Sequence, residues 1–267
     1  MGFGKWIGGY LGFVSAGPLG AIVGFIVGAL FDSMTTSSFI NEFGYKKDEE
    51  ANQTNYSRER EYEGQRNSFL ISMLTLASYV IKADGKVMHS EMEMVRQFLR
   101  QNFGEIAVQQ GEEIMLRLFE HQKQVGESQF RTTIYQSCRQ IAQNMDYSQR
   151  LQLLNFLVMI AQVDGNIHQK EIEAIQEIGS ALSLSQQDID SMLNLRGGGN
   201  DLDAAYKVLG ISKDATDDEV KAAYRKMALK HHPDRVATLG EDVKKAAEKK
   251  FQEINDAKDK IYKARGL

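Results

Sequence analysis

Apolar residues recur every three to four positions through most of the chain, which is the spacing of amphipathic helices rather than strands. The periodicity is sustained from about residue 67 to 195 and returns between residues 201 and 267. Proline occurs only at positions 18 and 233, so the sequence offers few points at which a helix must break. The pattern predicts an all-α protein.

The central stretch, residues 67–195, contains an internal repeat. The apolar positions of its first copy, Ile71, Met73, Leu74, Ala77 and Val80, correspond to Leu151, Leu153, Leu154, Leu157 and Ile160 of the second. Each copy then reaches the same turn, Asp84-Gly85 in one and Asp164-Gly165 in the other. Further helices between the copies are marked by Ile114, Leu118, Phe119, Phe130, Ile134, Cys138, Ile141 and Met145. We expect a helical bundle in which two helix–turn–helix units pack as a pseudo-symmetric pair.

The repeated turn and the glutamates that follow it, Glu91 with Glu93 and Glu171 with Glu173, resemble the TerB domain associated with tellurite resistance. The resemblance implies acidic residues at these turns and brings a metal site into consideration. If the turns converge, Asp84, Glu91, Asp164 and Glu171 would supply four carboxylates, which suit a hard divalent cation.

The same acidic residues also fit a structural interpretation. Asp-Gly is a common helix-ending turn, and acidic side chains favour the first turn of a helix in any case. Ser90 and Glu93 have the spacing of a capping box. An EF-hand is excluded, because the sixth and twelfth positions counted from Asp84 are His89 and Val95 rather than glycine and glutamate.

A second pattern follows near the end of the chain. Thr216 and Glu219 have capping-box spacing, and the helix they begin carries an apolar stripe of Val220, Tyr224 and Met227. Pro233 ends this helix. A later helix is marked by Val243, Ala247, Phe251, Ile254 and Ile261. The pattern predicts two antiparallel helices joined by a loop that presents His232-Pro233-Asp234, with a basic face on the first helix.

This region, residues 201–267, resembles the J domain of the DnaJ co-chaperones. The resemblance rests on residues 205–210 (AYKVLG), the run Tyr224-Arg225-Lys226, the His-Pro-Asp tripeptide and residues 251–255 (FQEIN). It implies that the loop and the basic helix bind a DnaK-type chaperone and stimulate its ATP hydrolysis. The residues implied to do so are His232, Pro233, Asp234, Tyr224, Lys221, Arg225, Lys226 and Lys230.

The N-terminal segment, residues 1–31, has no charged side chain between Lys5 and Asp32. As a straight helix the uncharged part would be roughly 39 Å long, more than the ~30 Å hydrocarbon core requires. Its glycines at positions 20, 24 and 28 share one helix face and would let two helices approach closely. We predict a membrane-spanning helix that contacts lipid and forms a homodimer through Gly20, Gly24 and Gly28.

Three alternatives stay open for this segment. It could form a re-entrant hairpin bent at Gly17-Pro18, a signal peptide ending at Val14-Ser15-Ala16, or a glycine-rich soluble hairpin. The positive-inside rule, applied to Lys5 alone, would place the body outside. A J domain needs ATP and a chaperone partner, so we expect the body to face the cytoplasm from the inner membrane. A polar tether, residues 32–66, and a glycine-rich joint, residues 196–200, complete the chain.

Charge and cysteine content narrow the function. The formal net charge of −4 argues against a nucleic-acid partner, and the single cysteine, Cys138, excludes an intramolecular disulfide. No Ser or Cys nucleophile lies near His232 in sequence, so we expect no enzyme and no cofactor apart from the divalent cation considered above.

The order of the three parts resembles the membrane-anchored DnaJ-like proteins of the DjlA type. We therefore expect a membrane-anchored co-chaperone. The alternative is a membrane-associated stress-response scaffold whose TerB-like domain binds metal ions or protein partners.

Overall fold

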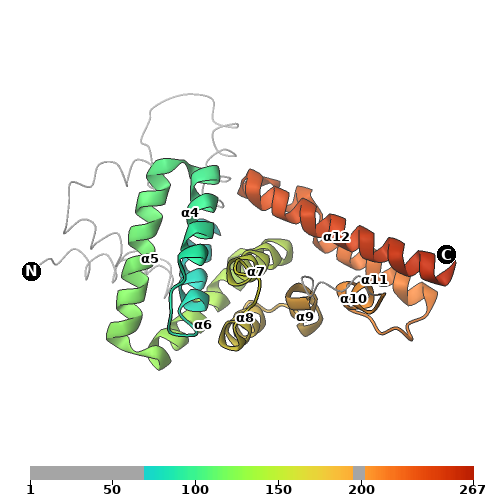
Figure 1. The fold of residues 1–267 in the computed structure, drawn as a ribbon, viewed down its shortest axis with the longest axis horizontal. Helices are drawn as coiled ribbons and strands as arrows, with labels where there is room; N and C mark the ends of the chain where they lie inside the picture. Colours follow the sequence, from blue (N-terminus) through green and yellow to red (C-terminus); the bar gives the residue numbers. More distant parts are fainter. Residues whose placement is uncertain (1–68, 195–201) are drawn as a thin grey trace, which may run out of the picture.

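The computed structural model describes residues 69–194 and 202–267, and these ranges fold into helices joined by short turns (Figure 1). The prediction of an all-α protein is confirmed, and the described ranges contain no strand. Within the same ranges, no helix combines the length and the hydropathy that crossing a membrane requires.

Several predictions fall outside the described residues. These are the membrane segment with its glycine face at Gly20, Gly24 and Gly28, the tether 32–66 and the joint 196–200. They stay predictions.

The two copies of the repeat each provide a pair of helices joined by the Asp-Gly turn. In the first copy a helix that includes residues 69–81 is followed by α4 (His89–Phe103), and in the second α7 (Tyr147–Ala161) is followed by α8 (Gln169–Ala181). Gly85 and Gly165 have φ values of 87° and 89°. Only glycine adopts this backbone conformation without strain, which explains why both turns need it.

α7 is the central helix of the bundle. Its N-cap is Asp146, whose carboxylate accepts a hydrogen bond from the Gln149 backbone N–H at 2.8 Å. The helix is apolar on nearly all sides, a composition that is stable in water only when the whole helix is covered. Its fully buried residues include Leu151, Leu153, Leu154, Leu157 and Ile160, as the repeat predicted.

The predicted capping box at Ser90 and Glu93 is wrong. α4 begins two residues earlier than that box requires, with Met88 as its N-cap, and the Met88 backbone N–H donates to the Glu91 carboxylate at 2.9 Å. Glu91 is buried at this helix start, whereas Glu93 forms an ion pair with Arg96 at 3.1 Å. Serine is a preferred N-cap residue and methionine is not, so the sequence favoured the later start at Ser90.

Two long helices connect the copies: α5 (Glu105–Val125) and α6 (Glu127–Asn144). Gly104 and Gly126 precede them with φ values of 81° and 83°. The residues that predicted these helices are buried at Ile114, Leu118, Phe130, Ile134, Cys138 and Ile141, while Phe119 and Met145 are half-buried.

The C-terminal part consists of α10 (Leu202–Val208), α11 (Asp217–Lys230), the 3₁₀ helix η1 (Pro233–Leu239) and α12 (Glu241–Arg265), preceded in the chain by α9 (Gln186–Asn194). α10, α11 and α12 share a small core of Ala205, Tyr206, Leu209, Val220, Met227, Ile254, Ala257 and Ile261. The Arg265 guanidinium donates to the Tyr206 hydroxyl at 2.7 Å and to the Ala215 carbonyl at 2.6 Å. The predicted antiparallel hairpin of α11 and α12 is present.

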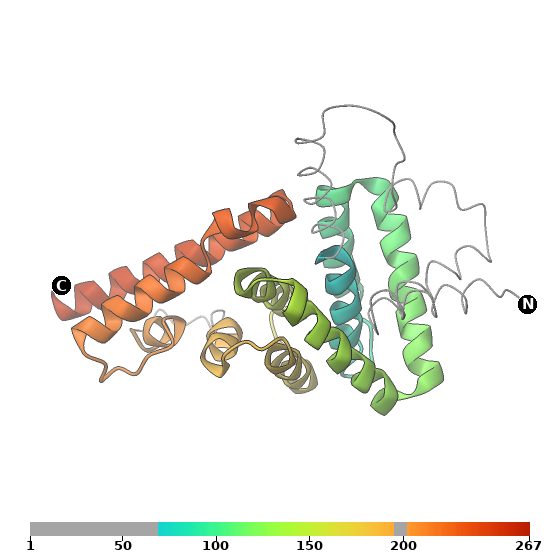
Figure 2. The same ribbon diagram turned by 180° about the vertical axis from the view of Figure 1, so that it is seen from behind.

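The loop end of this hairpin packs on the central bundle rather than on its own core. Val236 and Leu239 of η1 and Val243 and Ala247 of α12 belong to the core of the central domain. η1 contacts α7, and α12 contacts both α7 and α4. The two opposite views show that the C-terminal end of α12 points away from α5 (Figures 1 and 2).

Candidate functional site

The candidate site is the loop end of the α11–α12 hairpin, and its first element is the start of α11. The Glu219 backbone N–H donates to the Thr216 hydroxyl at 3.3 Å, and the Thr216 backbone N–H donates to the Glu219 carboxylate at 2.7 Å. The capping box predicted from sequence is confirmed, and it sets where α11 begins. The helix ends at Lys230, three residues before Pro233.

The His-Pro-Asp loop lies at the surface and is held by local contacts. His232 has the extended backbone that a residue before proline requires, with φ −64° and ψ 127°. Its Nδ1 accepts a hydrogen bond from the Asp234 backbone N–H at 3.3 Å, and its ring meets the Phe251 ring edge-on with centroids 5.6 Å apart. The side chains of His232 and Asp234 are 46% and 82% exposed. The loop conformation is therefore fixed by contacts within the chain, while its side chains stay accessible to a partner.

Tyr224 has a structural contact in addition to its predicted binding role. Its hydroxyl donates to the Asn255 side-chain oxygen at 3.0 Å, which ties α11 to α12. The Lys258 ammonium lies 5.2 Å from the centre of the Tyr224 ring. Tyr224 is half-buried, so part of its surface stays open beside the basic residues of α11.

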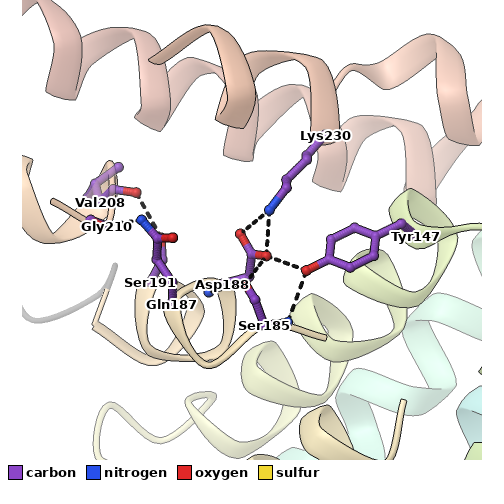
Figure 3. Close-up of polar contacts among 8 residues, drawn as sticks. All are labelled: Tyr147, Ser185, Gln187, Asp188, Ser191, Val208, Gly210 and Lys230. Atoms are coloured by element: carbon purple, nitrogen blue, oxygen red, sulfur yellow. Dashed lines mark hydrogen bonds and ion pairs between the residues drawn. The ribbon is translucent and has the colours of Figure 1, made fainter. Parts of the chain in front are cut away.

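The predicted basic residues are in two different environments. Arg225 and Lys226 are exposed on α11, and Lys221 is half-buried on the same helix. Lys230 instead points to the central domain, where its ammonium lies 2.6 Å and 2.8 Å from the two carboxylate oxygens of Asp188 (Figure 3). Lys230 is therefore turned away from the exposed surface that Arg225 and Lys226 share, and its predicted role in partner binding stays a prediction.

Asp188 of α9 is the centre of a polar cluster. It accepts hydrogen bonds from the hydroxyls of Tyr147 and Ser185, and the Tyr147 hydroxyl in turn accepts from the Ser185 backbone N–H at 3.0 Å (Figure 3). The Lys230 ammonium also lies 4.9 Å from the centre of the Tyr147 ring, within cation–π range. We call Tyr147, Ser185, Asp188 and Lys230 the Asp188 cluster.

Burial and hydrogen bonding act in opposite directions on Asp188. Burial alone would raise the pKa of its carboxyl, because the charged form loses solvation. The hydrogen bonds from the other three members of the cluster and the positive charge of Lys230 outweigh this, so the pKa lies below its usual value. Asp188 is held as a buried carboxylate with Lys230 as its counter-ion.

His231 lies beside this cluster and is 1% exposed. Neither of its ring nitrogens has a hydrogen-bond partner among the described residues. Burial, with a further contribution from the positive charge of Lys250, lowers the pKa of His231 to about 3. The imidazole is therefore neutral at physiological pH.

Sequence reasoning missed Asp188, Tyr147 and Ser185 as parts of the site. Asp188 lies in the first turn of a short helix, where an acidic residue is expected for local reasons. Tyr147 is the first residue of α7, directly after the capping Asp146, and nothing in this local pattern marks it as part of a site. No sequence signal connects either residue with Lys230, because they meet only when the two domains pack together.

The acidic turns form separate local contacts. The Asp84 carboxylate accepts from the Lys86 backbone N–H at 2.8 Å, and the Asp164 carboxylate accepts from the Ser90 hydroxyl at 2.8 Å. Ser90 thus links the start of α4 to the turn of the other copy. Each aspartate thus has a hydrogen-bond partner close to its turn.

Glu91 and Glu171 are brought together by the repeat. Each accepts a hydrogen bond from the backbone N–H three residues earlier, at 2.9 Å and 2.8 Å, and each is buried. Burial raises the pKa of Glu91 to about 8, and the neighbouring carboxyl of Glu171 adds to the rise.

No group of three or more His, Cys, Asp or Glu side chains in the described ranges is arranged to hold a metal ion. The structure therefore pairs Glu91 with Glu171 but does not bring Asp84, Glu91, Asp164 and Glu171 into one cluster. A cation site formed by these four residues stays a prediction.

Comparison with known families divides the chain into three matches in sequence order. Residues 1–48 match the co-chaperone DjlA transmembrane domain, residues 70–194 match the tellurite resistance protein TerB, and residues 204–264 match the DnaJ domain. The first match supports the prediction of a membrane-anchored protein.

Curated relatives repeat this organisation. The co-chaperone protein DjlA of Photobacterium profundum is 28% identical over 293 residues, covering 99% of this chain and 99% of its own length. The co-chaperone protein DjlA of Coxiella burnetii is 28% identical over 286 residues, covering 99% of this chain and 98% of its own.

A more local match is the DnaJ homolog subfamily C member 7 of Homo sapiens, which is 54% identical over 52 residues, 20% of this chain and 10% of that protein. No solved structure matches the chain. The order of the three family matches, together with similarity to DjlA proteins along nearly the whole chain, shows that this is a DjlA-type protein with a TerB domain and a J domain.

Proposed function

We propose that the chain is a membrane-anchored co-chaperone that recruits a DnaK-type chaperone and stimulates its ATP hydrolysis through the J domain. The observation that carries the proposal is the exposed His-Pro-Asp loop, fixed between two helices and placed next to exposed basic residues of α11. The similarity to DnaJ and DjlA proteins supports the same class of partner.

The basic residues bring the two proteins together. Arg225 and Lys226 are exposed on one helix, so an acidic surface on the chaperone would be attracted to them from a distance. Exposed charges are screened over ~10 Å at 0.1 M salt, so this part of the interaction weakens as ionic strength rises.

The loop supplies groups that can act after encounter. The Asp234 carboxylate is mostly exposed and can accept hydrogen bonds from the chaperone, while His232 is oriented by its contacts with Asp234 and Phe251. The chain performs no bond chemistry in this proposal, because ATP is bound and hydrolysed by the partner.

We also propose that the body faces the cytoplasm from the inner membrane. A DnaK-type partner needs ATP, and the match of residues 1–48 to the DjlA transmembrane domain supports an anchor ahead of the TerB domain. Protease added to sealed inside-out vesicles should digest the body, and protease added to right-side-out vesicles should leave it intact. The opposite pattern would contradict this orientation.

The functional test compares the full chain with His232→Gln in an assay of DnaK-type ATP hydrolysis. His232 is 46% exposed, so the variant should keep its helical content by circular dichroism while losing stimulation. Stimulation equal to wild type would refute the proposed role of the loop.

The test of the basic helix uses Lys226→Glu, with Lys260→Glu on α12 as the matched control, since both lysines are exposed. Lys226→Glu should weaken chaperone binding most at low salt, and Lys260→Glu should change it little. Equal effects of both variants would mean that only the overall charge matters.

A further inference from the structure

Two separate sets of contacts hold the J domain against the central domain. Near the start of the J domain, the Ser191 hydroxyl of α9 donates to the Val208 carbonyl at 2.8 Å, and the Gln187 side chain donates to the Gly210 carbonyl (Figure 3). At the other end, η1 and the first turns of α12 pack on α7 and α4. The Asp188 cluster joins Asp188 of α9, Ser185 just before it and Tyr147 of α7 to Lys230 at the end of α11.

The loop end is tightly fitted to α4. A β-carbon placed on Gly240, at the junction of η1 and α12, would lie 2.8 Å from the side-chain oxygen of Asn102 in α4. Val236, Leu239 and Val243, on both sides of this glycine, are each at most 4% exposed and belong to the core of the central domain. The contact is therefore a packed interface and extends beyond one ion pair.

Lys230 is withheld from solvent by this arrangement. Its side chain is 18% exposed and that of Asp188 is 1% exposed, and the two charges neutralise each other inside the interface. Removing one partner of a buried pair leaves an uncompensated charge, which is strongly unfavourable. Lys230 can turn to another acidic surface only if the J domain separates from α9, so that water can reach Asp188.

The remaining parts of the candidate site are open in the same arrangement. Arg225, Lys226 and Asp234 are exposed while Lys230 is engaged. A chaperone could therefore meet the outer basic residues and the loop first. It could include Lys230 only after the contact with Asp188 breaks.

We propose that the TerB domain restrains the J domain of its own chain, because Asp188 competes with the acidic surface of the DnaK-type chaperone for Lys230. Tyr147 and Ser185 orient the Asp188 carboxylate for this competition. The docked arrangement is the less active one, and release of the J domain completes the binding surface. This inference rests on the proposed function, since it supposes that Lys230 takes part in chaperone binding.

The first test measures stimulation of DnaK-type ATP hydrolysis by the full chain in detergent micelles, over a range of its concentrations. Asp188→Asn removes the charge that retains Lys230 but changes no residue of the proposed chaperone-binding surface. The half-maximal concentration should fall by about tenfold, which corresponds to ~1.4 kcal/mol of lost docking free energy. The maximal stimulation should stay the same.

The matched control is Asp190→Asn. Asp190 is exposed two residues further along α9, and the variant makes the same change in net charge. It should leave the stimulation curve unchanged. If Asp188→Asn destabilises α9, Tyr147→Phe provides a milder version, because it removes only a hydroxyl from the cluster, and the half-maximal concentration should still fall.

The second test follows docking without any chaperone, by hydrogen exchange of the backbone amides in residues 233–247. Exchange in this segment should be faster in Asp188→Asn than in the wild type and unchanged in Asp190→Asn. Equal exchange in all three proteins would overturn the inference, because Asp188 would then not hold the J domain.

The two measurements distinguish a failure of the restraint by Asp188 from a failure of the proposed co-chaperone function. If wild type and Asp188→Asn stimulate hydrolysis with the same half-maximal concentration, the restraint is wrong while the co-chaperone function stands. If neither protein stimulates hydrolysis, the proposed function fails, and the competition with the chaperone fails with it.

Discussion

The shared core between the two domains predicts an unusual effect of a single leucine. Leu239 is 1% exposed and is the last residue of the 3₁₀ helix that begins at Pro233, yet it packs in the core of the central domain. Leu239→Ala should therefore disturb the central domain as well as the hairpin that carries it.

The expected magnitude follows from how little the site can relax. Leucine-to-alanine changes in cores cost about 2–5 kcal/mol, more where the cavity cannot collapse. Val236 and Val243, on either side of Leu239, are also at most 4% exposed in the same core, so little room is left for the segment to move. We expect a loss in the upper part of that range, about 3–5 kcal/mol.

The free energy of unfolding is measured by urea titration of the full chain in detergent micelles, with circular dichroism as the signal. Hydrogen exchange then shows which helices the substitution destabilises. Leu229→Ala is the control for residue type: Leu229 is 61% exposed, so its loss should cost within about 0.5 kcal/mol. Leu209→Ala is the control for location, because Leu209 is fully buried in the core of the J domain itself.

Hydrogen exchange should distinguish the two buried leucines. Leu239→Ala should accelerate amide exchange in α7, and Leu209→Ala should accelerate it in α10, α11 and α12 with α7 unchanged. If Leu239→Ala leaves α7 exchange at the wild-type rate, the shared core is wrong.

Three further predictions concern titration and ions. The neutral, buried His231 has a pKa of about 3 against an ordinary 6.5, so the unfolded chain binds the extra proton and stability falls as pH drops below 6.5. At pH 4.5 the loss of folding free energy should reach about 2.7 kcal/mol, from two pH units at ~1.36 kcal/mol each. In urea titrations His231→Leu should abolish this loss, and His232→Gln should keep it. The pH dependence of stability has the opposite sign for Glu91, because its raised pKa makes the folded protein less stable as pH rises from 4.5 towards 8. In thermal unfolding, Glu91→Gln should therefore be more stable than wild type at pH 8 and similar to it at pH 4.5. If the four predicted carboxylates bind a cation, Ca²⁺ or Mg²⁺ should raise the melting temperature of the full chain, and Asp84→Asn with Asp164→Asn should remove the shift; no shift in the wild type would end the metal hypothesis.

Local patterns predicted most of the fold. The capping box at Thr216, the helix stop before Pro233 and the two Asp-Gly turns each depend on neighbouring residues, so the sequence contains the information directly. The all-round apolar composition of α7 likewise marks a buried helix.

Packing between the domains could not be predicted in the same way. Val243 and Ala247 have the periodicity of a helix that covers its own hairpin, but periodicity does not specify which neighbour covers an apolar face. The sequence likewise places Lys230 on the basic face of its helix, because helical spacing does not show which side chains a second domain covers. The distance between Lys230 and Asp188 shows that the two form a buried ion pair.

We propose that a DnaK-type chaperone binds the J domain at the His-Pro-Asp loop and the basic face of α11. The most direct measurement is hydrogen exchange of the full chain with and without the ATP-bound chaperone. Chaperone binding should slow exchange in residues 217–232 and speed exchange in α9, as the J domain leaves Asp188. Unchanged exchange in residues 217–232, with protection confined to residues 69–194, would contradict binding at the J domain.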